Sequence, residues 1–137
     1  MGLPRADRLR EIPLFAELSD KALEHIAGIA TELECPAGTV LARADEPGAG
    51  MFVVEEGTVA VEARGKTIEL GPGEFVGELT LLVPDTRRVA RIRALTDIRC
   101  LAIGRGDFQE LLEEEPGLAV AMLPVLAARL YGVMHPD

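Results

Sequence analysis

The chain has 137 residues, of which 48% are hydrophobic and 27% charged. This composition excludes a disordered chain and predicts one globular domain over residues 1–137. The 14 Lys and Arg residues stand against 23 Asp and Glu residues, a net charge of −9. That balance argues against a nucleic-acid-binding domain, because such domains usually neutralise phosphates with a basic face.

Residues 1–34 are predicted to form an N-terminal helical segment. Ser19 is a good N-cap, and the apolar residues that follow it recur with helical spacing, at Leu23, Ile26, Ala27 and Ala30. The charged N-terminus lacks the apolar stretch of a signal peptide. A cytoplasmic location is therefore expected, in which Cys35 and Cys100 are reduced thiols rather than a disulfide.

Residues 35–105 are predicted to form a β-body. Short β-branched or alternating runs are separated by glycine-containing turn signals, and they lie at residues 39–42, 51–55, 58–63, 67–70, 90–94 and 98–103. Many short strands at this spacing indicate a β-sandwich, jelly roll or barrel.

Residues 106–137 are predicted to form two C-terminal helices, the second over 117–134. That second helix is apolar nearly all round, so it must be covered on more than one side. One side is expected to lie on the β-body, and the other on a ligand or a second subunit. Intramolecular packing of both sides is the alternative. A membrane span is not expected, because the longest apolar run, 117–128, is short and contains Pro124.

Positive charge is concentrated in one segment of this acidic chain. Residues 87–105 hold six arginines and one acidic residue, a net of +5, and the remaining residues carry −14. A cationic segment in an acidic domain is a candidate anion site. Arginines on solvated strand faces are the alternative, which is weakened by four arginines within residues 87–93 next to a glycine-rich turn.

The residues around this segment suit a sugar phosphate. Gly73 and Gly77 let the backbone approach a ligand, and free N–H groups after such a turn can form an anion-binding nest. Residues 79–82 are expected to form one helical turn whose N-terminus also favours an anion. Arg88 offers a planar fork for phosphate oxygens, and the Glu78 carboxylate accepts hydrogen bonds from hydroxyl groups.

These motifs resemble the cyclic nucleotide-binding domain found in catabolite-activator-type transcription factors, cyclic-nucleotide-dependent kinases and cyclic-nucleotide-gated channels. The resemblance covers about residues 9–132. The family's phosphate-binding cassette is matched here by residues 73–94, with Phe75, then G-E-L-T-L-L from Gly77, then R-V-A-R-I-R-A from Arg88. The segments P-A-G-T-V-L and M-F-V-V-E-E-G-T-V-A-V also resemble the family's strands and turns.

The resemblance implies a mainly β fold with flanking helices, a β-roll or jelly roll of about eight strands. It implies that Glu78 holds the ribose 2′-OH and that Arg88 pairs with the cyclic phosphate. The last helix would lie over the base, with Arg129 or Tyr131 as a cap. The ligand-binding residues implied are Gly77, Glu78, Leu79, Thr80, Arg88, Val89 and Ala90.

Three positions depart from the family's pattern. Val76 is inserted between the phenylalanine and the glycine. Val89 replaces a small residue beside the phosphate, so its side chain either crowds the pocket or points away. Arg91 replaces a Thr or Ser whose hydroxyl helps some members to hold guanine, which removes one reason to favour cGMP. Strand alternation leaves open whether Arg91 faces the ligand or solvent.

Enzymatic sites are not predicted. His25 and His135 are isolated in the sequence, and no predicted strand carries the His and carboxylate cluster that a cupin metal centre requires. Ser19, the single serine, is expected to be a helix cap rather than a nucleophile. No catalytic residue, metal or cofactor is predicted.

The sequence thus predicts a regulatory domain that binds cAMP in preference to cGMP and signals by movement of its C-terminal helix. The expected partners are the cyclic nucleotide, an unidentified downstream protein and a second copy bound through residues 117–134; nucleic acid and membrane are not expected. The alternative is a degenerate fold that acts in protein interaction or dimerisation without binding nucleotide.

Overall fold

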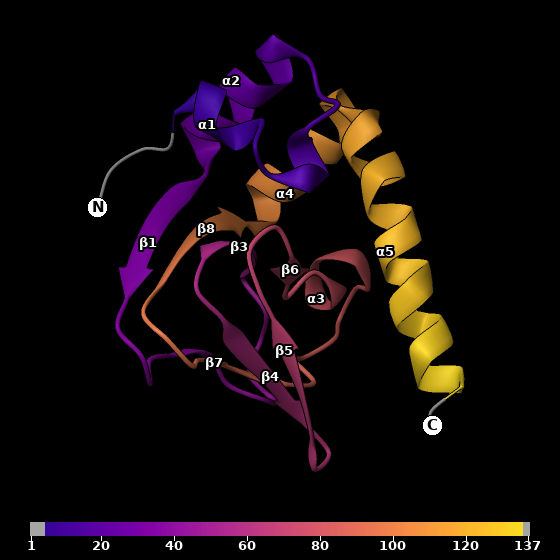
Figure 1. Ribbon diagram of the computed structural model, residues 1–137. Coiled ribbons are helices and arrows are strands. Elements are labelled where there is room, and N and C mark those ends of the chain that lie inside the picture. Colours follow the sequence, from indigo (N-terminus) through magenta and orange to yellow (C-terminus); the bar gives the residue numbers. More distant parts are fainter. Residues whose placement is uncertain (1–4, 136–137) are drawn as a thin grey trace.

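Two antiparallel four-stranded sheets form the body of the protein in the computed structural model, which describes residues 5–135. The strand orders are β1-β8-β3-β6 and β2-β7-β4-β5 (Figure 1). The fold class predicted from the sequence is confirmed. The strands are β1 (Thr31–Cys35), β2 (Val40–Ala42), β3 (Gly50–Glu56), β4 (Val59–Ala63), β5 (Lys66–Leu70), β6 (Phe75–Val76), β7 (Arg91–Ala94) and β8 (Ile98–Gly104).

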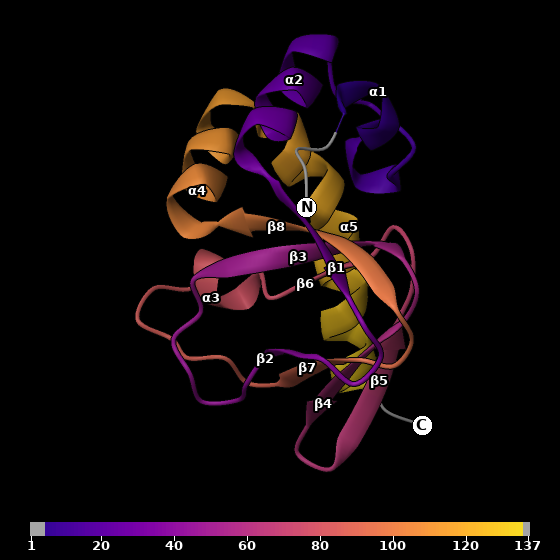
Figure 2. The same cartoon turned by 90° about the vertical axis from the view of Figure 1, so that its left-hand side faces the viewer.

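Helices precede and follow this β-roll in the chain, and one short helix lies between β6 and β7. They are α1 (Ala6–Leu9), a 3-10 turn η1 (Pro13–Phe15), α2 (Asp20–Ile29), α3 (Leu79–Leu82), α4 (Arg105–Glu114) and α5 (Pro116–Met134). Ser19 caps α2 as predicted, because its Oγ accepts a hydrogen bond from the Ala22 N–H at 3.1 Å. Helices α1, α2 and α4 gather at one end of the β-roll (Figure 2).

Two apolar clusters form the core, one on each side of β3. Val53 packs with the cluster under the helices, which includes Phe15, Ile26 and Phe108. Its neighbour Val54 belongs to the second cluster, between the sheets. Successive side chains of a strand point to opposite faces, so β3 joins the two clusters.

The prediction that residues 1–34 are helical is wrong at its C-terminal end. Helix α2 ends at Ile29, and residues from Thr31 onward form β1, which pairs antiparallel with β8. Leu33 and Cys35 alternate along this strand and pack against the second cluster, which is the two-residue period of a strand. The two-residue strand β6 also went unpredicted, because it is too short to show a period.

Both cysteines are free thiols: Cys35 is partly buried and Cys100 is buried. Burial, with smaller contributions from the neighbouring Cys35 and Glu55, raises the pKa of Cys100 to about 12. The thiol is therefore held in its neutral form inside the core.

Helix α5 runs along the side of the β-roll (Figure 1). Its buried residues, Leu118 and Met122, lie in its first half, where α5 contacts η1 and α4. The helix is long and apolar enough, by length and composition, to cross a membrane, with a mean hydropathy of 1.7. One such helix is weak evidence for a membrane span.

Candidate functional site

A cavity of about 590 Å³ opens between the second sheet, the segment around α3 and the second half of α5. Its volume lies in the range of small-molecule sites, roughly 300–1,000 Å³. Apolar side chains from β4, β5 and β7 line one part, and the predicted cassette lines another. The lining residues are Val61, Lys66, Ile68, Glu69, Leu70, Glu74, Val76, Gly77, Glu78, Leu79, Thr80, Arg88, Val89, Ala90, Ile92, Ala128, Arg129, Gly132 and Val133.

Gly77 gives the cassette its shape. Its φ of +93° lies in the left-handed region, between β6 and α3, where a side chain is disfavoured. A Cβ at this position would lie 2.9 Å from Arg88 Nη1 and 3.1 Å from the Gly50 carbonyl oxygen. The absence of a side chain therefore lets Arg88 approach the turn.

The Arg88 guanidinium is held from two sides. Its Nη2 donates a hydrogen bond to the Gly50 carbonyl oxygen at 2.9 Å, and its Cζ lies 5.8 Å from the centre of the Phe52 ring. Burial lowers the pKa of Arg88, and the carboxylate of Glu46 partly opposes this shift. Since burial disfavours the charged form, a bound anion would offset that cost.

Glu78 is buried at the floor of the cavity, with 4% of its surface exposed. Its carboxylate Oε1 accepts a hydrogen bond from Arg129 Nη1 of α5 at 3.4 Å. An ionised carboxylate accepts several hydrogen bonds. Glu78 can therefore take a further hydroxyl donor from within the cavity.

Arg129 reaches the cassette from α5. Its Nη2 donates to the Phe75 carbonyl oxygen at 2.5 Å, and its Cζ lies 4.6 Å from the centre of the Phe75 ring. Beyond Leu126, Arg129 is the one α5 residue that is not exposed. The second half of this helix thus meets the β-roll through a single arginine.

Two backbone N–H groups beside the cavity have no backbone partner. Those of Val89 and Ala90 donate no backbone hydrogen bond within residues 5–135. Both residues line the cavity. Unpaired N–H groups near a guanidinium are suited to an anion.

The structure brings all seven predicted ligand-binding residues to the cavity, and Arg129 with them. Tyr131, the other predicted cap, lies elsewhere: it is 65% exposed and stacks on His135, with ring centres 4.2 Å apart. The cavity-facing residues of α5 are 128, 129, 132 and 133, one helical face. Position 131 is two residues beyond Arg129, about 200° around the helix, and so faces away.

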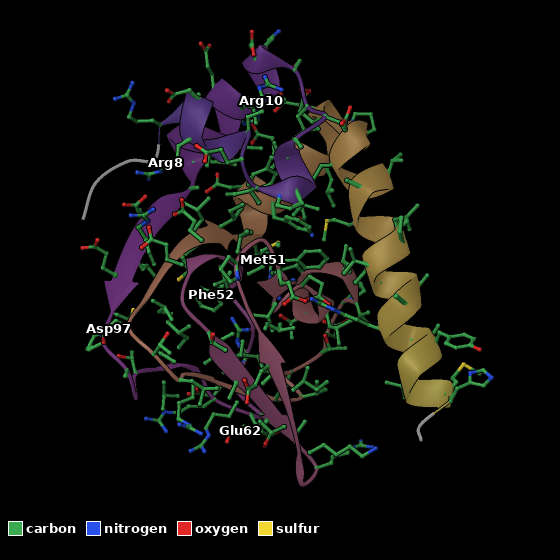
Figure 3. All side chains as sticks on the ribbon, viewed as in Figure 1. Arg8, Arg10, Met51, Phe52, Glu62 and Asp97 are labelled. Atoms are coloured by element: carbon green, nitrogen blue, oxygen red, sulfur yellow. The ribbon has the colours of Figure 1, made fainter. Side chains whose placement is uncertain are left out.

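The structure also answers two questions that the sequence left open. Val89 is 64% exposed and lines a cavity that stays open, so its side chain does not fill the pocket. Arg91 pairs with Glu62 of β4 at 2.8 Å and is not a lining residue. Figure 3 places Glu62 at the end of the β-roll far from α4.

Sequence reasoning missed the apolar wall and the supports of the site. Ile68, Ile92 and Val133 come from three separate elements, and only tertiary packing brings them together. The sequence places Phe52 in a strand, as the structure does, and does not show that its ring lies beside the Arg88 guanidinium. The alternation of β3 does not indicate that its partly buried face meets Arg88.

Comparison with known proteins agrees with this geometry. The family model of the cyclic nucleotide-binding domain matches residues 32–115. The chain is 39% identical over 108 residues to a cyclic nucleotide-gated potassium channel of Mesorhizobium japonicum, covering 79% of this chain and 30% of the channel. It is 34% identical over 110 residues to a cAMP-dependent protein kinase regulatory subunit of Aspergillus fumigatus, covering 76% and 26%.

A solved structure is similar along almost its whole length. The N-terminal domain of a transcriptional regulator from Streptomyces coelicolor matches with a TM-score of 0.69 and 35% identity, covering 93% of this chain and 94% of that one. By contrast, the chain spans about 30% of the length of the first curated relatives. Matched in sequence over residues 32–115 and in fold over nearly all its length, the chain belongs to the cyclic nucleotide-binding domain family.

Proposed function

We propose that this chain is a regulatory module that binds cAMP in preference to cGMP in the cavity under α5, and that it signals through α5. The observation that carries the proposal is the placement of Glu78, Arg88 and Arg129 around one cavity. Each supplies the chemistry for a different part of a nucleotide. Catalysis forms no part of the proposal.

The phosphate would bind at Arg88. Its guanidinium is positioned by Gly50 and Phe52, and the unpaired N–H groups of Val89 and Ala90 lie on the same loop. A planar guanidinium and backbone donors together match the oxygens of a phosphate.

The ribose would bind at Glu78, and the base against the apolar wall that includes Ile68 and Val133. Thr80 is the one lining residue with an aliphatic hydroxyl, and that hydroxyl donates to the Gly77 carbonyl oxygen at 3.4 Å. Arg91 is engaged by Glu62 and does not line the cavity, so it is not placed to contact the extra polar groups of guanine. This, with the cAMP-dependent relative, supports the preference for cAMP.

Signalling would start at the shared carboxylate. A ribose hydroxyl and Arg129 would both donate hydrogen bonds to the Glu78 carboxylate. Ligand binding would therefore change the hydrogen bond that holds the second half of α5. Ligand moves the helix only to the extent that it binds one helix position better than another. The exposed apolar side chains of α5, such as Leu123 and Leu130, would contact a second copy or a downstream protein, which would then respond to the position of the helix.

The same exposed apolar side chains favour the alternative, an interaction or dimerisation module that binds no nucleotide. A cytoplasmic location stays a prediction, for which the two free thiols are supporting evidence.

The test is calorimetric titration of the chain with cAMP and then cGMP, beside Arg88→Ala. We expect cAMP to bind more tightly than cGMP. Loss of a charged hydrogen bond of roughly 1.5–3 kcal/mol should weaken binding by roughly tenfold to 150-fold in Arg88→Ala. Arg87→Ala is the matched control, because Arg87 is exposed, donates to the Asp45 carbonyl oxygen and does not line the cavity.

Absence of binding by either nucleotide would overturn the proposal and favour the interaction module. Equal losses in Arg87→Ala and Arg88→Ala would overturn the assignment of the phosphate site. Hydrogen exchange of α5 with and without cAMP tests the signal: unchanged protection in residues 126–134 would contradict it.

A further inference from the structure

A second cluster of ligating side chains lies away from the nucleotide cavity, where α2 meets α4. His25 of α2 is partly buried, and Glu110 and Glu114 of α4 are exposed. The two glutamates are four residues apart, so they lie on one face of α4. Helices α2 and α4 contact each other (Figure 2), and none of the three residues lines the cavity.

The ligand atoms are close enough to share one metal ion. One atom from each residue lies within 4.8 Å of the other two, and His25 Nδ1 lies 3.5 Å from a Glu114 carboxylate oxygen. Ligand atoms at about 2.0–2.1 Å from a tetrahedral zinc are about 3.4 Å apart. His25 and Glu114 already have this separation. Rotation of the exposed Glu110 side chain would bring its carboxylate to the same distance from both of them.

An ion pair between His25 and Glu114 does not account for the whole cluster. Glu110 and Glu114 are like charges four residues apart, which destabilises a helix. Within residues 5–135 neither carboxylate lies within 4.0 Å of a Lys or Arg nitrogen. Helix α4 carries four acidic residues and one arginine, so the surrounding charge also favours a cation.

We propose that His25, Glu110 and Glu114 bind a zinc ion, with water completing the tetrahedral coordination. Imidazole with carboxylates suits zinc, whereas magnesium and calcium prefer oxygen ligands alone. A zinc ion here would hold α2 to α4, the helix that precedes α5 in the chain. A metal that binds the folded chain stabilises it by mass action, so zinc should raise the melting temperature.

The test is titration of the EDTA-treated, reduced chain with zinc chloride, followed by calorimetry and thermal unfolding. We expect one zinc per chain and a higher melting temperature. His25→Gln and Glu110→Gln should each weaken zinc binding by roughly tenfold or more, because each removes one of three protein ligands. His135→Gln is the matched control, since His135 is the other histidine of the chain and stacks on Tyr131.

Nuclear magnetic resonance keeps the proposal testable if a variant loses stability. The chain has two histidines, so zinc should shift the ring nitrogen resonances of His25 and leave those of His135 unchanged. The proposal is overturned if the His25 ring does not respond at saturating zinc. It is also overturned if His25→Gln binds zinc like the parent, or if Cys35→Ser abolishes binding. Since His25 is outside the cavity, failure here leaves the nucleotide proposal intact.

Discussion

Arg129 of α5 and Glu78 of the cassette meet at 3.4 Å, although 51 residues separate them in the sequence. The arginine also donates to the Phe75 carbonyl oxygen at 2.5 Å. Pro124 lies inside α5 before this contact, and a proline removes one backbone hydrogen bond of a helix. The second half of α5 is therefore held mainly by Arg129.

Replacing Arg129 should release that half of the helix. In Arg129→Ala we expect amide hydrogen exchange in residues 126–134 to rise by roughly tenfold, the equivalent of one charged hydrogen bond. Residues 117–123 should keep their protection, because Leu118 and Met122 remain buried. Tyr131→Ala is the control, and equal exchange in the two variants would contradict the role of Arg129.

Glu78 should distinguish ribose from deoxyribose. Glu78→Ala should weaken cAMP binding by roughly tenfold to a hundredfold, since a charged hydrogen bond is lost. The same variant should lose much less affinity for 2′-deoxy-cAMP, because that ligand lacks the hydroxyl donor. Glu78→Gln keeps one acceptor oxygen and should recover part of the affinity. Calorimetric titration with both ligands measures these affinities. Equal losses of affinity for cAMP and 2′-deoxy-cAMP would contradict a contact between Glu78 and the 2′-OH.

Gly77 should matter for binding as well as for stability. Gly77→Ala strains a positive φ, at a cost of about 1–2 kcal/mol, and places a Cβ 2.9 Å from Arg88 Nη1. Gly65→Ala is matched in strain, with φ +76°, but its Cβ would meet nothing within 4 Å. We expect the melting temperature to fall in both variants, and further in Gly77→Ala, with a loss of cAMP affinity in Gly77→Ala alone. Retained affinity in Gly77→Ala would argue against the close approach of Arg88.

Glu62 should make stability depend on pH. Hydrogen bonds from Arg93 and then Arg91 lower the pKa of Glu62 from its ordinary value of 4.5. The folded state therefore gains stability above that value and loses it as the pH falls through the lowered pKa. In Glu62→Gln we expect a lower melting temperature at pH 7 and a difference that shrinks toward pH 3. A difference in melting temperature that does not change with pH would contradict the role of the Glu62 ion pairs. At pH 7, 1 M salt should reduce the difference in melting temperature, because salt screens the ion pairs.

The sequence by itself determined the cassette, because its residues are local to one another. Residues 73–94 contain the glycine, the carboxylate and the arginine within one continuous segment, and all seven predicted binding residues line the cavity. Gly77 needs its conformation whatever surrounds it. Alternation located six of the eight strands. It missed β1, which was assigned to the helical segment, and β6, which has two residues.

Tertiary structure alone decided which distant side chains meet. Arg129 and Tyr131 are equivalent candidates on an apolar helix until the helix is placed, and its rotation then turns Arg129 inward and Tyr131 outward. In the sequence His25 is isolated, and the packing of α2 on α4 brings two glutamates to it. Contacts across elements depend on how whole faces pack, which local spacing does not encode.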